Sequence, residues 1–303
     1  MDKTQKDELL RLAGKKVRFD CPMDQYTTFH VGGKAEALYK ANDLRGLRQV
    51  INYLSKADIP YLAIGRGSNL LVMDEGIDGV VIQFKGSLAA IEREKTDAVV
   101  VRAGAGLSIM DLLTYCRSSG LGGLEFLAGI PGTVGGAVVM NAGASGKEIG
   151  VWVEAVDVIT RRGELLTMGS AELEFSYRRL RFEKGSLVVQ ARLKLDIETE
   201  EIVGGRIADH LKWRKETQPL EYPSAGSVFK NPPNDYAGRL IESAGLKGER
   251  LGGAMISEKH ANFIVNTGGA KARDVLGLMN LAREKVKKKT GIDLQPEIQV
   301  VGC

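Results

Sequence analysis

The sequence predicts an α+β protein with more than one domain. Three observations lead to this prediction. Apolar residues recur at strand spacing in some segments and at helix spacing in others. A length of 303 residues is enough for two or three hydrophobic cores. The composition changes near residue 198, where a series of short strands gives way to a long charged helical segment.

Helical periodicity, with suitable capping residues, predicts the helices. Asp43 and Ser108 stand where an N-cap is expected, directly before apolar residues at helical spacing. The predicted helices cover residues 5–13, 44–54, 109–118, 202–217, 237–244 and 272–289. Residues 170–182 are expected to form a short helix that passes into a basic loop.

Short apolar or alternating runs predict the strands. In chain order they cover residues 35–40, 61–64, 80–84, 88–93, 98–103, 151–160, 164–168, 187–195, 254–256, 263–265 and 297–301, and a short apolar run stands at 70–73.

Composition excludes several classes of protein. Hydrophobic residues at 44% and charged residues at 26% are typical of a soluble globular protein. A net charge of +4 is too small to indicate nucleic-acid binding, although it suits an anionic substrate. The apolar runs are shorter than the ~18 residues of a membrane span, and residues 1–16 lack the apolar core of a signal peptide. We therefore expect a cytoplasmic protein without a nucleic-acid or membrane partner, and no obligatory protein partner is evident.

The cysteines and histidines predict neither disulfides nor a metal site. Cys21, Cys116 and Cys303 are odd in number and widely spaced, which favours a reducing compartment. The three histidines, His30, His210 and His260, are isolated from one another in the sequence.

Residues 120–146 are the most unusual stretch of the chain. Nine of them are glycine, Glu125 is the only charged residue, and apolar residues separate the glycines. A flexible linker would instead be rich in serine, proline and charge. We expect a buried, ordered segment whose main-chain N–H groups are available to an anionic or polar ligand. A set of tight turns without a ligand is the alternative.

A second glycine-rich turn follows the predicted strand 61–64. Its sequence, Gly65-Arg66-Gly67-Ser68-Asn69, can present several N–H groups to an anion. The dinucleotide-binding fingerprint requires a third glycine, which is missing at position 70, and no GxxxxGK[ST] phosphate loop occurs in the chain. The turn therefore predicts an anion site of another kind.

Three further places combine reactive side chains with turns. Arg178, in the run Ser176-Tyr177-Arg178-Arg179, can hold a carboxylate through two parallel hydrogen bonds. Ser227 ends the turn Ser224-Ala225-Gly226-Ser227, with Lys230 and Asn231 just beyond it. Glu297 opens the last predicted strand. A solvated loop, an ordinary turn serine and a solvated glutamate are the respective alternatives.

Six motifs in order carry a resemblance to a known family: TTFHVGG, GRGSNLLV, GLEFLAGIPGTVGGAVVMNAGA, SYR, SAGSVFKNP and LQPEIQVVG. They span residues 26–302 and resemble the UDP-N-acetylenolpyruvoylglucosamine reductases, also called UDP-N-acetylmuramate dehydrogenases or MurB proteins. Only nine residues separate Tyr177 from the strand at 187, so the chain resembles the shorter class, which lacks a tyrosine-bearing insertion. How the cleft excludes water in this class is left open.

The resemblance implies a fold and a domain division. It implies an FAD-binding module of the vanillyl-alcohol-oxidase (PCMH) type over residues 26–196, with subdomains at 26–85 and 86–196. A lead-in at 1–25 precedes this module, and an α+β substrate-binding domain at 197–303 follows it.

The resemblance also implies an activity with two cofactors, FAD and NADPH. NADPH reduces non-covalently bound FAD and leaves. The substrate, UDP-N-acetylenolpyruvoylglucosamine, then takes a hydride from flavin N5 at C3 and a proton at C2, which gives UDP-N-acetylmuramate for peptidoglycan and cell-wall synthesis. Another FAD-dependent oxidase or dehydrogenase on the same scaffold and a non-catalytic flavin-binding regulator remain alternatives.

The resemblance assigns roles to matching residues. Arg178 would stabilise the substrate carboxylate, Ser227 would donate the proton, and Glu297 would assist at the enolate. Arg214, Lys230 and Asn231 would bind the UDP end. The residues expected to bind FAD are Gly65, Arg66, Gly67, Ser68, Asn69, Gly129, Ile130, Pro131, Gly132, Thr133, Gly135, Gly136, Asn141 and Gly143. Arg66 departs from the glycine frequent at its position.

Overall fold

The computed structural model describes residues 1–94 and 99–302, and it divides into two compact units, each made of three chain segments. The first unit comprises Met1–Phe19, Ala37–Gly65 and Gly79–Lys212. The second comprises Asp20–Glu36, Arg66–Asp78 and Trp213–Cys303. Residues 95–98, where one predicted strand begins at 98, and Cys303 lie outside the described residues.

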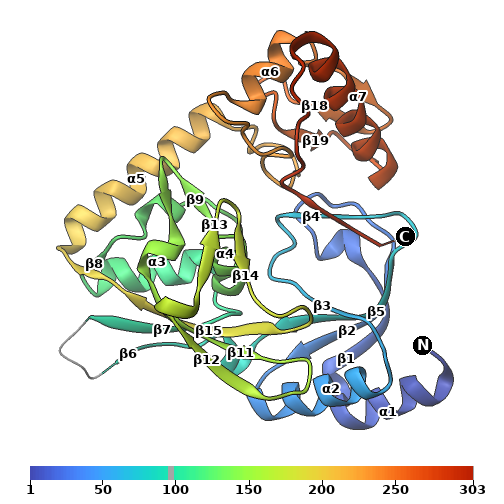
Figure 1. The fold of residues 1–303 in the computed structure, drawn as a ribbon, viewed down its shortest axis with the longest axis vertical. Coiled ribbons are helices and arrows are strands. Elements are labelled where there is room, and N and C mark those ends of the chain that lie inside the picture. Colours follow the sequence, from blue (N-terminus) through green and yellow to red (C-terminus); the bar gives the residue numbers. More distant parts are fainter. Residues whose placement is uncertain (95–98, 303) are drawn as a thin grey trace. The chain divides into compact units, whose positions relative to one another are not determined.

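A four-stranded sheet near the N-terminus has the order β1-β2-β5-β3 and packs against two helices (Figure 1). Its strands are β1 (Val17–Pro22), β2 (Lys34–Ala41), β3 (Tyr61–Ala63) and β5 (Ile77–Phe84). The helices are α1 (Lys3–Ala13) and α2 (Leu44–Lys56). In α2 the apolar residues Leu47, Val50, Ile51 and Leu54 are buried at helical spacing, and the Asp43 carboxylate accepts from the Gly46 N–H at 2.7 Å. The predicted cap and helix are therefore confirmed.

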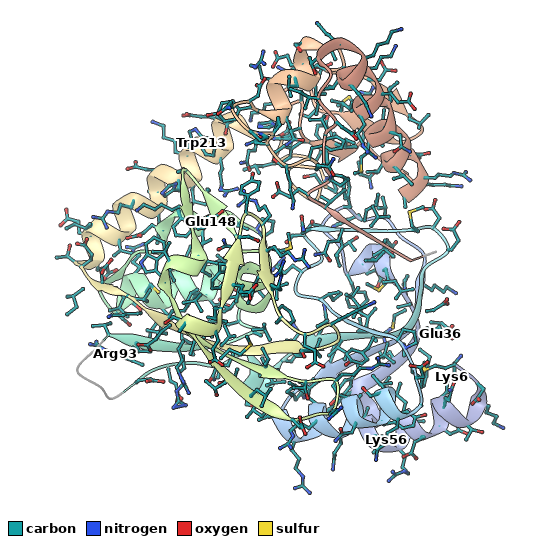
Figure 2. The ribbon with its side chains drawn as sticks, in the orientation of Figure 1. Lys6, Glu36, Lys56, Arg93, Glu148 and Trp213 are labelled. Atoms are coloured by element: carbon teal, nitrogen blue, oxygen red, sulfur yellow. The ribbon has the colours of Figure 1, made fainter. Side chains whose placement is uncertain are left out.

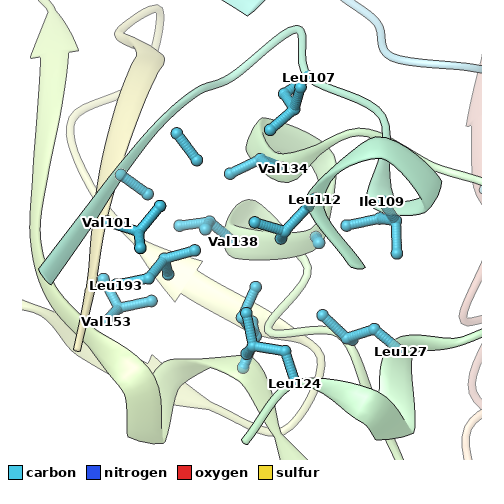
Figure 3. Packing of buried hydrophobic residues seen from close by; sticks show 14 of the residues in the cluster. Val101, Leu107, Ile109, Leu112, Leu124, Leu127, Val134, Val138, Val153 and Leu193 are labelled. Carbon is cyan, nitrogen blue, oxygen red and sulfur yellow. The ribbon is translucent and has the colours of Figure 1, made fainter. Parts of the chain in front are cut away.

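The second sheet of the first unit is five-stranded and antiparallel, in the order β12-β11-β15-β7-β6. Its strands are β6 (Ile91–Arg93), β7 (Val100–Gly104), β11 (Val153–Ile159), β12 (Leu165–Gly169) and β15 (Leu187–Lys194). Helices α3 (Ile109–Ser118) and α4 (Val134–Val139) pack on one face of this sheet (Figure 1). Val101 and Leu193 from the sheet meet Leu112, Val134 and Val138 from the helices in one core (Figure 3).

Short strands and one long helix complete the first unit. Three two-stranded pairs form: β8 (Leu121–Gly122) with β16 (Asp196–Ile197), β9 (Gly143–Ala144) with β10 (Lys147–Glu148), and β13 (Glu174–Ser176) with β14 (Arg179–Arg181). The helix is α5 (Glu200–Thr217), which continues into the second unit. None of the helices in the described parts of the chain combines the length and the apolar character that a bilayer crossing requires.

The glycine-rich residues 120–146 are ordered, and most of the segment up to residue 138 is buried, as the sequence predicts. The one charged residue, Glu125, is 4% exposed. Its carboxylate accepts from the Gly123 N–H at 2.9 Å and pairs with Arg206 of α5 at 3.3 Å. A buried carboxylate requires such partners, so Glu125 fastens the segment to α5.

Two local predictions are wrong, and one helix was not predicted. Residues 170–182 form a single 3₁₀ turn at Ser170–Glu172 followed by the β13–β14 hairpin, because Phe175 and Leu180 face each other across the pair. Residues 86–89, at the start of the strand predicted at 88–93, form another 3₁₀ turn. Helix α4 was not predicted, since its two glycines disfavour helix by propensity and packing overrides that preference.

The second unit is built on two small sheets and two helices (Figure 1). Strands β4 (Leu70–Val72) and β20 (Gln299–Val301) pair in parallel, and β17 (Arg250–Leu251), β18 (Ala254–Ile256) and β19 (Ile264–Asn266) form an antiparallel sheet. Helices α6 (Ala237–Ser243) and α7 (Ala272–Thr290) share one core with β18 and β19.

Asp74, in the loop after β4, caps helix α7. Its carboxylate accepts from the N–H groups of Ala272 and Arg273, the first two residues of that helix, at 2.8 and 3.2 Å. Lys271 precedes the helix and offers no side-chain oxygen of its own. The cap therefore comes from a residue about two hundred positions earlier, and it ties the loop after β4 to α7.

We expect Asp74→Ala to lower the free energy of unfolding by about 0.5–2 kcal/mol, the usual effect of losing an N-cap. Asp74→Asn keeps an acceptor oxygen and should retain most of that stability. Urea unfolding of both variants at equal flavin content measures the difference. Equal losses in the two variants would mean that the negative charge, rather than the cap, stabilises the helix.

Candidate functional site

Gly65, the first residue of the turn after β3, lies against Thr133. A Cβ atom on Gly65 would lie 2.5 Å from the Thr133 Oγ1, which is a collision. The Gly65 carbonyl accepts from the Gln83 Nε2 at 3.2 Å, and this bond fixes the turn to β5. Within the first unit, the structure thus brings together two of the segments that the sequence predicts to bind a cofactor.

The rest of that turn, residues 66–69, lies in the second unit. Gly67 has φ of 63°, and a Cβ there would lie 2.4 Å from the Tyr26 carbonyl oxygen, so glycine is required. The Asn69 Nδ2 donates to the Glu297 carbonyl at 3.2 Å. Asn69 therefore holds the main chain of a predicted catalytic residue.

Residues 129–136 run over the N-terminal end of α4, the short helix that packs on the five-stranded sheet. The Gly135 N–H donates to the Ala105 carbonyl at 2.9 Å, and a Cβ on Gly135 would lie 2.7 Å from the Ala105 Cβ. Gly136 differs, because it is exposed and the nearest atom to an added Cβ is the Thr133 Oγ1 at 3.7 Å. Gly135 serves packing, and Gly136 leaves bare main chain open to a ligand.

Six further residues predicted to bind a cofactor lie at or near the surface of their units. Arg66, Gly129 and Pro131 are exposed, and Ser68, Ile130 and Gly132 are half-buried. Two glycine-rich turns meeting at Gly65 and Thr133 fit a cofactor whose phosphates approach main-chain N–H groups. The pyrophosphate and ribityl chain of FAD have this chemistry, so the residues present fit FAD.

Asn141, predicted to lie near the flavin, is only 2% exposed and has φ of 41°. Its Nδ2 donates to the Glu148 carboxylate at 2.7 Å and to the Ser176 carbonyl at 3.1 Å (Glu148 is labelled in Figure 2). Its Oδ1 accepts from the Gly150 N–H at 3.0 Å. Both ends of the amide bind protein, so Asn141 connects the end of α4 with the β13–β14 hairpin.

Arg178 lies in the turn of that hairpin. Its φ is 59°, a conformation that residues other than glycine rarely adopt. Its Nη2 donates to the Gly143 carbonyl at 3.2 Å, and its guanidinium carbon lies 5.0 Å from the centre of the Tyr177 ring. Arg178, Asn141 and Gly143 therefore form one cluster, and the guanidinium has the planar shape that binds a carboxylate.

Ser227 and Glu297 lie in the second unit, on two segments that pair with each other. The Glu297 N–H donates to the Val228 carbonyl at 2.8 Å, and the Lys230 N–H donates to the Gln295 carbonyl at 2.9 Å. Ser227, Lys230 and Glu297 are all half-buried. The structure thus brings these three predicted residues together, whereas Arg178 belongs to the first unit.

The last two predicted substrate-binding residues differ in character. Arg214 is 9% exposed, and burial lowers the pKa of its guanidinium to about 10, which still leaves it charged at neutral pH. Its Nη1 donates to the Gln218 side chain at 3.2 Å. Asn231 is exposed, and its Oδ1 accepts from the Ala237 N–H at 3.0 Å, which caps α6. A buried cation suits an anionic ligand, whereas the Asn231 oxygen already has a structural partner.

Two other features of the structure lie apart from the predicted residues. A surface recess of about 410 Å³ on α2, lined by Leu44, Arg45, Arg48, Gln49 and Asn52, contains none of them. Over residues 1–94 and 99–302, no three His, Cys, Asp or Glu side chains gather as metal ligands would.

Asn262 is not among the predicted site residues, although it is buried and bonded to the segment that carries Ser227. The run Asn262-Phe263-Ile264-Val265-Asn266 places a polar amide at each end of a buried apolar strand. Two such amides beside a buried strand could have pointed to Asn262 from the sequence, because buried polar groups need hydrogen-bond partners.

Comparison with known proteins gives two family matches. Residues 35–169 match the FAD binding domain, and residues 218–301 match the C-terminal domain of UDP-N-acetylenolpyruvoylglucosamine reductase. The reductase of Geobacter metallireducens is 45% identical over 96% of this chain and 95% of its own length. UDP-N-acetylenolpyruvoylglucosamine reductase 2 of Symbiobacterium thermophilum is 43% identical over 95% and 92%, respectively.

Comparison with solved structures leads to the same family. The crystal structure of UDP-N-acetylenolpyruvylglucosamine reductase (MurB) from Thermus caldophilus superposes with a TM-score of 0.81 at 38% identity, over 94% of this chain and 98% of that one. Berberine bridge enzyme shares the fold alone, with a TM-score of 0.50 at 14% identity over 66% and 44% of the two chains. The predicted PCMH-type fold and the predicted cofactor FAD are confirmed. The chain belongs to the UDP-N-acetylenolpyruvoylglucosamine reductase family of FAD-dependent oxidoreductases.

Proposed function

We propose that this chain uses NADPH to reduce the enolpyruvyl ether of UDP-N-acetylenolpyruvoylglucosamine, and so makes UDP-N-acetylmuramate for peptidoglycan. One observation carries the proposal: two hydrogen-bonded segments bring together Ser227, Lys230 and Glu297. A proton donor and a cation held this way suit an anionic substrate that must be protonated, and a carboxylate on the paired segment can polarise the donor. We further propose that residues 26–196 form the FAD-binding module, residues 197–303 form the substrate domain, and the enzyme works in the cytoplasm.

The reaction adds a hydride and a proton across one carbon–carbon double bond. When bound, FAD would supply the hydride that C3 of the enolpyruvyl group takes up, with NADPH as its source. The electron pair of the double bond then moves toward C2 and the attached carboxylate. An enolate forms there, and its charge must be stabilised before the proton arrives.

We assign Arg178 to that charge and Ser227 to the proton. The Arg178 guanidinium holds the substrate carboxylate as its negative charge grows, which lowers the barrier more than it strengthens ground-state binding. The Ser227 hydroxyl gives its proton to C2, and Glu297 assists at the enolate or helps to polarise the hydroxyl. Lys230 and the buried Arg214 cation attract the diphosphate of the sugar nucleotide. Asn231 contributes through its amide N–H groups, because its oxygen caps α6.

We expect the purified protein to be yellow and to release FAD into the supernatant when it is precipitated with acid. NADPH oxidation should then require UDP-N-acetylenolpyruvoylglucosamine, with UDP-N-acetylmuramate as the product. NADPH oxidation that runs equally well without the sugar nucleotide would favour another oxidase on the same scaffold. A colourless protein that takes up no added FAD would overturn the proposal altogether.

A further inference from the structure

Asn262 bonds twice to a single residue of the segment that carries Ser227. It lies between β18 and β19 and is 3% exposed. Its Nδ2 donates to the Phe229 carbonyl at 2.8 Å, and the Phe229 N–H donates to its Oδ1 at 3.0 Å. The side-chain amide therefore pairs with Phe229 as a neighbouring strand's peptide group would.

The main chain around Asn262 extends this pairing. The Val228 N–H donates to the Asn262 carbonyl at 2.9 Å, and Ser227 forms an antiparallel bridge with Phe263. On its other side, the segment pairs with the one that carries Glu297, through an antiparallel bridge between Phe229 and Pro296. Residues 227–230 are thus the middle of three hydrogen-bonded segments.

The requirement for an amide at this position follows from burial. Phe229 is 1% exposed, so its N–H and carbonyl cannot turn to water. Leaving a buried main-chain group without a partner costs about 1–3 kcal/mol. One side chain that donates and accepts in the same plane satisfies both groups, and among small side chains asparagine does so. Without this amide, a shift that finds new partners for the Phe229 N–H and carbonyl stabilises the segment. Any such shift moves Ser227, which is only two residues from Phe229.

We propose that Asn262 is a positioning residue, whose amide fixes residues 227–230 against the Glu297 segment so that the Ser227 hydroxyl is held for proton transfer. This inference rests on the proposed function, because it assumes that Ser227 is the proton donor. Asn262 itself bonds to Phe229 and acts through it. Misplacement of a reacting group by about 1 Å can lower a rate by up to 10²-fold, which sets the scale of the expected effect.

The test measures the two half-reactions of the FAD-loaded enzyme by stopped flow, in wild type and three variants. Asn262→Ala removes both bonds to Phe229, and Asn262→Asp keeps the volume and the acceptor but loses the donor. Asn266→Ala is the matched control, because Asn266 is also a buried asparagine, 8% exposed. Its side chain bonds to main chain outside residues 227–230: its Nδ2 donates to the Phe29 carbonyl, and its Oδ1 accepts from the Gly268 N–H. Asn262→Asp serves as the main variant if the alanine variant does not fold.

We expect Asn262→Ala and Asn262→Asp to slow reoxidation of the reduced flavin by saturating UDP-N-acetylenolpyruvoylglucosamine roughly tenfold or more. Flavin reduction by NADPH should stay within twofold of wild type, and Asn266→Ala should leave both rates near wild type despite its loss of stability. Reoxidation within twofold of wild type in the Asn262 variants, or equal damage to both half-reactions, would overturn the inference. A wild-type enzyme that the sugar nucleotide cannot reoxidise would instead refute the proposed function.

Discussion

Replacing Ser227 with alanine is expected to slow proton delivery to the substrate by about 10²–10⁴-fold, the usual effect of losing a positioned general acid. The change removes one oxygen from a half-buried residue in a segment that pairs with a neighbouring segment on each side. Folding, FAD content and affinity for the sugar nucleotide should therefore change little. Stopped-flow reoxidation of the reduced flavin by substrate, together with a binding measurement, separates the rate from the affinity.

Two further variants sharpen the Ser227 prediction. Ser227→Cys should keep part of the activity, because a thiol can also deliver a proton. Ser224→Ala, in the same turn, is the matched control. The Ser224 main-chain carbonyl accepts from the Thr28 hydroxyl at 2.7 Å, and alanine keeps that carbonyl. Turnover of Ser227→Ala within a fewfold of wild type, or a loss due to affinity alone, would show that the proton comes from another group.

Replacing Arg178 with alanine is expected to slow reoxidation by the enolpyruvyl substrate by about 10²–10³-fold, as for loss of a transition-state hydrogen-bond donor. Flavin reduction by NADPH should be much less affected, because the carboxylate that we assign to Arg178 belongs to the sugar nucleotide. Alanine and arginine both carry a Cβ, so the strain of a φ of 59° is similar in the two proteins. Rates of both half-reactions by stopped flow measure the difference.

Neighbouring residues supply the controls for Arg178. Arg178→Lys keeps the charge but not the planar fork, and it should recover only part of the rate. Arg179→Ala removes an exposed arginine from the next position and should leave both half-reactions near wild type. Equal damage to the two half-reactions in Arg178→Ala would mean that Arg178 supports the hairpin or binds NADPH rather than the substrate carboxylate.

Sequence alone predicts features whose causes are local. Asp43 and Ser108 were expected as N-caps, and each accepts a hydrogen bond from the N–H three residues later, at 2.7 and 3.0 Å. The glycine-rich turns were expected as ligand sites because bare main chain can present its N–H groups to a ligand, and that expectation stays a prediction. The six motifs indicated the family, since they occur in order and several of them are long.

What the sequence could not predict depends on distant partners. The hairpin at 174–181 falls in the segment for which the sequence predicts a short helix passing into a basic loop, and nothing in the sequence marks the positive φ that Arg178 adopts at its turn. Asn141 bonds to Ser176, and Asn262 bonds to Phe229, each more than thirty residues away along the chain. An asparagine in a sequence looks the same whether it caps a helix, contacts a ligand or pairs with a buried strand.

Strand β1 was missed although a local signal was present. Val17, Phe19 and Cys21 alternate with polar residues, and Val17 and Cys21 are buried as that pattern predicts. Helix α4 is the opposite case, because nothing local favours a helix with two glycines in its first turn, and its contacts with β15 and β7 determine it.

We propose above all that hydride from the bound flavin reaches the enolpyruvyl group of the sugar nucleotide. The most direct test reduces the FAD of the purified enzyme with NADPH under anaerobic conditions, removes the nicotinamide nucleotide, and adds UDP-N-acetylenolpyruvoylglucosamine. We predict that the visible absorbance of oxidised flavin returns as UDP-N-acetylmuramate appears in amounts equal to the flavin. A flavin that stays reduced with the sugar nucleotide, and is reoxidised only when oxygen is admitted, would contradict the account.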